Sequence, residues 1–262
     1  MTREPKYPVQ TVTKAIEIFH YLAADTGTQG VGITELSREL EMGKSTIHRL
    51  LDTLQYYGYI EKDENSNRYQ LGWELYRVGQ AVPRQNQLFS LNPSYLMELS
   101  QETQETVNLG ILKRNETVII SKIEGSRNGL RVNINPGEYE SIYATGLGKA
   151  MICEMDEAQI RELLNGQEIL TKYTENTIAS VSELLEEERR IRECGYAVDA
   201  EEYCKGLYCI AMPLRDYTGK IIAAVSVSTP TVRMDEEKRK LVLGALRKSA
   251  DDISRKLGYR KD

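Results

Sequence analysis

The 262-residue sequence has few of the features that mark membrane, secreted or zinc-binding proteins. No apolar run approaches the ~18 residues that a membrane-spanning helix needs. The first ten residues, MTREPKYPVQ, contain no apolar signal-peptide segment. The four cysteines are too few for a disulfide framework, and the two histidines, His20 and His48, lie far from them in sequence. We therefore expect a cytoplasmic protein with no membrane contact, no metal site and no cofactor.

An excess of basic residues is also missing. The chain carries 34 Lys and Arg against 39 Asp and Glu, a formal net charge of −5. The first eighty residues hold nine basic and eleven acidic side chains. This balance argues against a protein that coats nucleic acid with a broad basic surface. Any DNA contact must come from a few locally placed charges.

The first seventy residues have the pattern of a small helical domain. An amphipathic helix is expected over 12–23, with the buried stripe Val12, Ala15, Ile16, Phe19, Leu22 and Ala23. Thr34 is the expected N-cap of a short second helix. A three-residue turn ends at Gly43, which is expected to take a conformation that other residues resist. A third helix is expected to begin at Lys44 or Ser45.

Two short helices joined by such a turn are typical of a helix-turn-helix. Two strand candidates, 59–62 and 68–71, flank a polar turn and predict a wing. The third helix offers N–H groups and hydroxyls to phosphate, and longer side chains to base edges. The candidate DNA-binding residues are Lys44, Ser45, Thr46, His48, Arg49 and, on the wing, Arg68. The alternative is a helical domain that binds protein and has a solvated face.

The rest of the chain predicts an α+β domain with a mainly antiparallel sheet. Strands are expected at 107–112, 117–123, 129–134, 207–214 and 220–228. Helices are expected at 93–103, 148–155, 157–164, 181–194 and 235–257, after a linker helix over 73–82 that ends near Pro83. The expected domains are 1–72 for the winged helix-turn-helix, 73–88 for the linker, and 89–262 for the α+β domain.

Two short segments of this domain are candidates for a ligand site. Ser226 and Ser228 share one face of an apolar strand, where buried hydroxyls need partners. They bond either to neighbouring groups or to a ligand. The segment 143–149 has Tyr143 where a phosphate loop needs Gly, and Met151 where a dinucleotide motif needs a small residue. It is either a tight packing turn or a helix start whose N–H groups suit one carboxylate.

Several motifs in the same order resemble the IclR family of regulators. They are Gly32–Leu40, Gly43–Leu51, Gly58-Tyr59-Ile60, Tyr69–Gly72, Ala144–Ala150, Gly206–Ala211 and Ala224–Ser228. The resemblance covers nearly the whole chain. It implies an N-terminal winged helix-turn-helix that binds double-stranded operator DNA, and a C-terminal GAF-like domain that binds a small organic acid.

The resemblance also implies an effector site. The backbone at Gly146 and Leu147 would bind the acid group, and Ser226 and Ser228 would donate hydrogen bonds. Asp199, Leu207 and Cys209 would line the cavity. Because Asp199 suits an anion poorly, we expect it to accept hydrogen bonds from effector hydroxyls, which favours a hydroxylated acid. Cys209 is expected to act as a small apolar side chain with a weak donor.

Two other functions are alternatives to a ligand-responsive regulator: an enzyme and a DNA-binding protein whose C-terminal domain only oligomerises. An enzyme is disfavoured because neither histidine lies in the C-terminal half to serve as a base. A domain that only oligomerises is disfavoured by the hydroxyls on an apolar strand.

Within the family, residues 32–37, 122–124 and 257–259 resemble regulators of 2-keto-3-deoxygluconate and pectin-sugar use. We expect a repressor that forms a dimer or a dimer of dimers. The alternative is a regulator of aromatic-acid or glyoxylate use.

Overall fold

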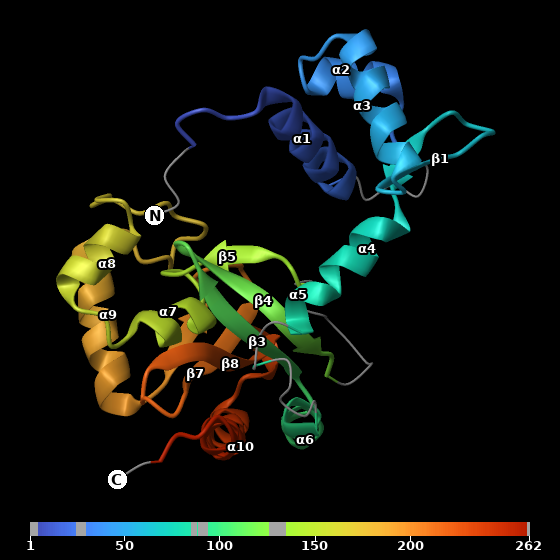
Figure 1. The fold of residues 1–262 in the computed structure, drawn as a ribbon. Coiled ribbons are helices and arrows are strands. Elements are labelled where there is room, and N and C mark those ends of the chain that lie inside the picture. The colour runs from blue at the N-terminus through green and yellow to red at the C-terminus, as the bar shows by residue number, and fades with distance from the viewer. Residues whose placement is uncertain (1–4, 25–29, 85–87, 89–93, 126–134, 261–262) are drawn as a thin grey trace. The chain divides into compact units, whose positions relative to one another are not determined.

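A computed structural model describes residues 5–24, 30–84, 88, 94–125 and 135–260 (Figure 1). Contacts within the chain divide it into two units, Arg3–Ser90 and Leu91–Asp262. Each unit has its own buried apolar core. No helix in these described ranges is long and apolar enough to cross a membrane.

The N-terminal unit is a helix-turn-helix with a two-stranded wing, as the sequence predicts. Its elements are α1 (Gln10–Ala24), α2 (Ile33–Glu39), α3 (Lys44–Tyr56), β1 (Ile60–Lys62), β2 (Tyr69–Leu71), α4 (Trp73–Gly79) and α5 (Ala81–Arg84). β1 and β2 pair antiparallel, with Glu61 opposite Gln70. Val31 adds a backbone bridge to Tyr69. The wing is therefore fastened to the segment that enters α2.

The buried face of α1 differs from the predicted stripe. Val12 and Ile16 are 56% and 48% exposed, whereas Ile18 is fully buried and packs with Leu22 in the core. The helix carries apolar residues on two faces, and spacing alone does not say which one the core takes. The prediction of Val12 and Ile16 as core residues is wrong. Their side chains form a second, uncovered apolar face.

Two predictions about α2 and the turn that follows it are also wrong. α2 begins at Ile33 after Gly32, which gives no side-chain cap, so Thr34 is not the N-cap. The left-handed residue of the turn is Glu41, with φ of 52°, whereas Gly43 has an ordinary φ of −59°. The Ser37 hydroxyl donates to the carbonyl of Met42 at 2.5 Å. This bond stabilises the turn without a strained glycine.

One antiparallel sheet forms the centre of the C-terminal unit. Its described strands lie in the order β5-β4-β3-β8-β7-β6. They are β3 (Thr106–Lys113), β4 (Glu116–Ile123), β5 (Tyr139–Ser141), β6 (Ala197–Ala200), β7 (Leu207–Arg215) and β8 (Ile221–Pro230). The central strands β3 and β8 are paired so that Asn108 lies opposite Ser226.

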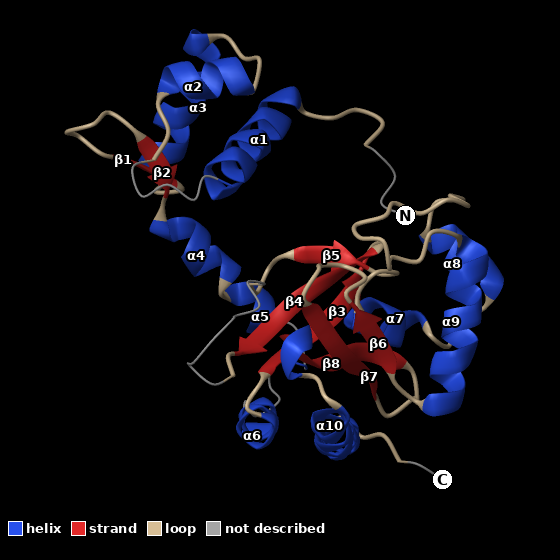
Figure 2. Cartoon of the chain, turned by 180° about the vertical axis from the view of Figure 1, so that it is seen from behind, coloured by secondary structure: helices blue, strands red, loops and turns tan. Residues whose placement is uncertain are grey.

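Helices cover both faces of this sheet (Figure 2). α6 (Ser94–Thr103) and α10 (Glu236–Lys256) lie side by side on one face, where they contact β3 and β7. α7 (Gly146–Ile152) packs on the other face, with α9 (Val181–Cys194) against it and α8 (Glu157–Leu163) beside them. This arrangement confirms the predicted α+β class.

Most predicted helices and strands of this unit are confirmed. The differences are one shifted helix start and two short strands that were not predicted. The helix over 181–194 begins and ends where the pattern places it. The helix predicted at 148 begins two residues earlier, at Gly146. β5 and β6 were not predicted, because strands of three and four residues are too short to show an alternating pattern. The strand predicted at 129–134 lies outside the described residues.

One core position of α9 is occupied by a carboxyl group. Val181, Leu184, Glu188 and Ile191 form the buried stripe of the helix. Glu188 is fully buried, and neither of its carboxyl oxygens has a hydrogen-bond partner. Burial raises the pKa of Glu188 to about 9, against the opposing effect of the Lys149 ammonium. The side chain is therefore protonated in the folded protein at neutral pH.

We expect Glu188→Gln to stabilise the protein at neutral pH. Between the ordinary pKa near 4.5 and about 9, the folded state keeps a proton that the unfolded chain has released. Stability therefore falls as pH rises through this window. The substitution should raise the free energy of unfolding by about 1–3 kcal/mol at pH 7.5 and by much less at pH 4.

Urea unfolding of the full chain at both pH values measures this effect. Glu186→Gln, on the exposed side of the same helix, is the matched control and should change stability little at either pH. An equal gain for Glu188→Gln at pH 4 and pH 7.5 would contradict a buried, proton-binding carboxyl group.

Candidate functional sites

The start of α3 presents most of the predicted DNA ligands to solvent. Lys44, Ser45, His48 and Arg49 are exposed, and Thr46 is half-buried. The preceding Gly43 gives the helix no side-chain cap. The N–H groups of the first turn are therefore open to an anion such as a phosphate.

Arginines neutralise the acidic side chains of α2. Arg38 pairs with Glu39 at 2.7 Å. Arg68 lies 3.1 Å from Glu35, and its Nε also donates to the carbonyl of Gly30 at 2.6 Å. The guanidinium of Arg68 thus ties the wing to α2 within the domain. Its contact with DNA stays a prediction.

Lys44 and Arg49, by contrast, make no ion pair or hydrogen bond through their side chains to the part of the chain that the structure describes. The acidic side chains of α2 are paired, so they compete less with the basic side chains at the start of α3 for a phosphate. The net negative composition of the domain does not prevent a phosphate contact at this surface.

All seven predicted effector residues line one buried cavity of the C-terminal unit. They come from α7, β6, β7 and β8, and are Gly146, Leu147, Asp199, Leu207, Cys209, Ser226 and Ser228. Four further residues complete the lining: Asn108, Glu140, Thr145 and Tyr203. The structure thus brings the predicted set together, and the binding of an effector there stays a prediction.

Curling of the sheet brings its two edge strands to this cavity. Glu140 lies on β5 and Asp199 on β6, the opposite edges of the strand order, yet both line the same space. Burial raises the pKa of Glu140 to about 7, and the nearby Asp199 carboxylate adds to the effect. Burial likewise raises the pKa of Asp199 to about 7. At neutral pH the two groups therefore do not both carry a full negative charge.

A row of hydrogen-bonding side chains crosses the sheet beneath the cavity. Asp199, Cys209 and Ser228 are register partners on three neighbouring strands. The Ser228 hydroxyl oxygen accepts from Asn108 Nδ2 and from Cys209 Sγ, each at 3.1 Å. Since its oxygen is already an acceptor, the single proton of Ser228 is left to donate. The hydroxyl of Ser226 makes no hydrogen bond to another described residue.

Close packing sets the position of the first turn of α7. Thr145 is the N-cap, and its hydroxyl accepts from the N–H of Gly148 at 3.2 Å. A Cβ on Gly148 would lie 2.4 Å from the Cα of Ile142, so only glycine fits there. The packing interpretation of this turn is thus correct for Gly148. It leaves the N–H groups of Gly146 and Leu147 beside the cavity.

A buried ion pair joins α7 to the loop after β6. The Nζ of Lys149 donates to both carboxylate oxygens of Glu202, at 2.6 and 2.7 Å, and lies 3.5 Å from Glu187 of α9. The N–H of Glu202 in turn donates to Asp199 at 2.7 Å. The Lys149 ammonium therefore connects α7 to β6, and both elements line the cavity.

The cavity is nearly closed in this structure. The space available to the centre of a water-sized molecule is about 10 Å³, enough for about one water. Tyr203 lines it, and its ring lies 5.1 Å from that of Tyr173, which lies 6.2 Å from Tyr143. An acid of several carbon atoms can enter only if these aromatic rings or their loops move.

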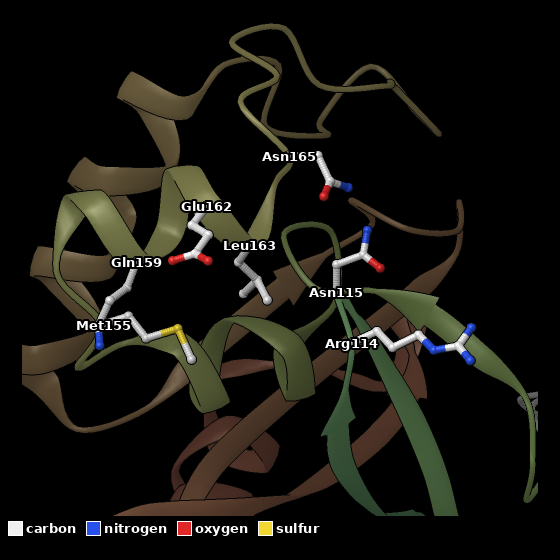
Figure 3. A pocket seen from close by; sticks show the side chains of 7 residues that line it. All are labelled: Arg114, Asn115, Met155, Gln159, Glu162, Leu163 and Asn165. Atoms are coloured by element: carbon white, nitrogen blue, oxygen red, sulfur yellow. The ribbon is translucent and has the colours of Figure 1, made fainter. Parts of the chain in front are cut away.

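A larger hollow, of about 450 Å³, lies between α8 and the β3–β4 turn (Figure 3). Figure 3 shows Asn115 of the turn pointing toward Asn165, with Glu162 on α8 and Arg114 extending away from them. These side chains are exposed to solvent. An open surface of mixed charge lacks the converging buried polar groups of a small-molecule site, so we do not assign an effector to it.

Sequence reasoning missed four residues of the lining. Asn108 was recoverable, because it is a polar side chain inside the otherwise apolar strand 107–112. Glu140 and Tyr203 gave no signal, since their segments have no periodic pattern. Only the curled sheet places them beside the serines.

The geometry suits binding better than catalysis. Burial raises the pKa of the Cys209 thiol well above its ordinary value, and this thiol donates to Ser228. A protonated, buried thiol is a poor nucleophile. The lining of the cavity contains no histidine. Among the described residues, no three His, Cys, Asp or Glu side chains gather to hold a metal ion.

Comparisons with known proteins agree with this architecture. The family model described as the IclR helix-turn-helix domain matches residues 11–64, and the one described as the bacterial transcriptional regulator IclR C-terminal matches residues 80–255. The transcriptional regulator KdgR of Escherichia coli is 35% identical over 249 residues, 95% of this chain and 94% of KdgR. XynR of the same organism is also 35% identical, over 96% of this chain and 98% of XynR.

Solved structures show the same fold. The crystal structure of the Thermotoga maritima IclR protein matches with a TM-score of 0.81 and 30% identity, over 96% of this chain and 100% of that one. Together with the two family models, these matches cover both units. This chain belongs to the IclR family of bacterial transcriptional regulators.

Proposed function

We propose that this regulator binds operator DNA through α3 and responds to a small hydroxylated keto acid held in the cavity under α7. The observation that carries the effector proposal is the convergence of all seven predicted residues on one buried cavity. The proposed effector is an acid such as 2-keto-3-deoxygluconate and the proposed role is a repressor of sugar-acid use, because residues 32–37, 122–124 and 257–259 resemble regulators of that pathway. Glyoxylate and an aromatic acid belong in the ligand panel as the alternative.

The two ends of the cavity suit the two ends of such an acid. Gly146 and Leu147 offer backbone N–H groups, and Ser226 and Ser228 offer hydroxyl protons to a carboxylate. Asp199 offers oxygens to hydroxyl groups. Because the cavity has room for about one water, binding of such an acid requires a wider state. The effector can shift the DNA-binding equilibrium only through this difference in affinity for the two states.

Two copies of the chain are the proposed DNA-binding form. A single winged helix reads too few base pairs for specificity, and a dimer reads two half-sites. The N-terminal unit has uncovered apolar side chains on two segments. Val12 and Ile16 lie on α1, and Trp73 and Tyr76, which are 74% and 62% exposed, lie on α4. These surfaces are the proposed contact between copies.

Replacing both aromatic residues of α4 should weaken this dimer. Trp73→Ser with Tyr76→Ser removes large apolar surface from the proposed contact, so the double variant should sediment as a smaller species at micromolar concentration. Its operator affinity should fall as well. Tyr217→Ser, an equally exposed tyrosine of the other unit, is the control. A wild-type chain that sediments as a monomer would refute the proposal.

Arg49→Ala should reduce affinity for the operator by about 1–3 kcal/mol and relax sequence preference, since the exposed Arg49 is proposed to contact base edges. Ser45→Ala should weaken operator and random DNA equally, because its hydroxyl would touch phosphate. Fluorescence anisotropy on a duplex selected by the wild-type protein, and on a scrambled duplex of equal length, separates the two effects. Equal losses on both duplexes for Arg49→Ala would show that it reads no base.

Removing both pocket hydroxyls should abolish the response to effector without changing DNA binding. The Ser226→Ala, Ser228→Ala double variant loses two donors to a charged group, each worth about 1.5–3 kcal/mol. Calorimetry with 2-keto-3-deoxygluconate and operator release are the measurements, with the exposed Ser182→Ala as control. Unchanged effector binding in the double variant would show that the effector does not bind in this cavity. The proposal that α3 binds DNA would not be affected.

A further inference from the structure

The cavity contains an acceptor that the family resemblance did not supply. Glu140 is 5% exposed and lines the cavity from β5. Its carboxyl group makes no hydrogen bond or ion pair with another described residue. The residues on either side of it in the chain, Tyr139 and Ser141, are more exposed. A buried carboxyl group without a partner costs free energy that a stably folded domain normally avoids.

No cation compensates Glu140 within the cavity. Its described lining contains no lysine or arginine. Lys149, the nearby buried cation of α7, already donates to both carboxylate oxygens of Glu202. A structural ion pair with a described residue therefore does not explain Glu140, and its carboxyl group is available to a ligand in the cavity.

Donors and acceptors are divided within the cavity. The donors are the hydroxyls of Ser226 and Ser228 and the first N–H groups of α7. The acceptors are Glu140, Asp199 and the unpartnered Oδ1 of Asn108. The carboxylate of a ligand only accepts hydrogen bonds, so it can pair with the donors of the lining but not with its acceptors. The acceptors need a ligand that carries O–H groups as well.

We infer that Glu140 determines effector specificity: its carboxyl group accepts hydrogen bonds from hydroxyls of the bound acid and disfavours acids that lack them. This inference rests on the proposed effector function of the cavity. An acid without hydroxyls brings the same carboxylate into the cavity but leaves Glu140 without a donor. Rejection by an unpaired buried polar group discriminates far more strongly than apolar fit.

A matched pair of acids tests this role. 2-Keto-3-deoxygluconate and 2-oxohexanoate share one carbon chain and one keto acid group, and differ in the three hydroxyls. Calorimetry on the full chain measures both for the wild type and for Glu140→Gln. The variant should bind 2-keto-3-deoxygluconate about tenfold or more weakly, since one acceptor oxygen becomes a donor and the remaining hydrogen bond is no longer to a charged group. It should bind 2-oxohexanoate as well as the wild type or better.

Glu138→Gln is the matched control, because Glu138 lies on the same segment but is exposed and accepts from Asn135. Thermal unfolding checks that each variant folds, and Glu140→Ala provides a second variant with the same expected change in preference. Asp199→Asn tests the acceptor on the opposite edge strand, and should shift the preference in the same direction.

Different results separate the inference from the proposed function. Equal weakening of both acids by Glu140→Gln would indicate a structural role and overturn the inference. So would unchanged binding of both acids while the double serine variant loses them, and in that case the effector function would stand. If the wild type binds none of these acids, nor glyoxylate or an aromatic acid, both the proposed effector function and the inference about Glu140 are wrong.

Discussion

The C-terminal unit depends on one buried ammonium group. Lys149 is fully buried on α7, and its Nζ contacts Glu202 after β6 and Glu187 on α9. Removing one partner of such a pair leaves an uncompensated charge in the interior, which typically costs about 3–5 kcal/mol. The pair therefore holds the helix, the edge strand and the covering helix in one arrangement. The first turn of α7 and the edge strand β6 both line the cavity, so their relative position sets its shape.

This arrangement suits a sensor because it is tight but not uniformly apolar. The space beneath α7 holds about one water, yet hydroxyls, an amide and two carboxyl groups converge on it. A ligand that satisfies these groups needs a wider cavity than this structure has. The ring of Tyr203 lines the space and lies 5.1 Å from that of Tyr173. A ligand that binds the wider state better than the other can control a distant function through this difference in affinity.

Placement of charge, rather than its amount, allows an acidic protein to present a DNA-binding helix. Glu35 and Glu39 of α2 are each paired with an arginine, while Lys44 and Arg49 of α3 make no side-chain pair within the described chain. Composition counts all of these residues alike. A phosphate near the start of α3 experiences mainly the unpaired ones and the open N–H groups.

Sequence by itself determined the features that repeat along one segment. The periods of 3.6 and 2 located α3, α9 and the long strands, and motif order pointed to the family and to seven of the cavity residues. Tertiary structure decided which face of α1 is buried, how Arg68 is engaged and where Glu140 lies. Each of these depends on contacts between residues far apart in the chain. Glu140 meets Asp199 only because the antiparallel sheet curls until its edges approach, and no local pattern records that curvature.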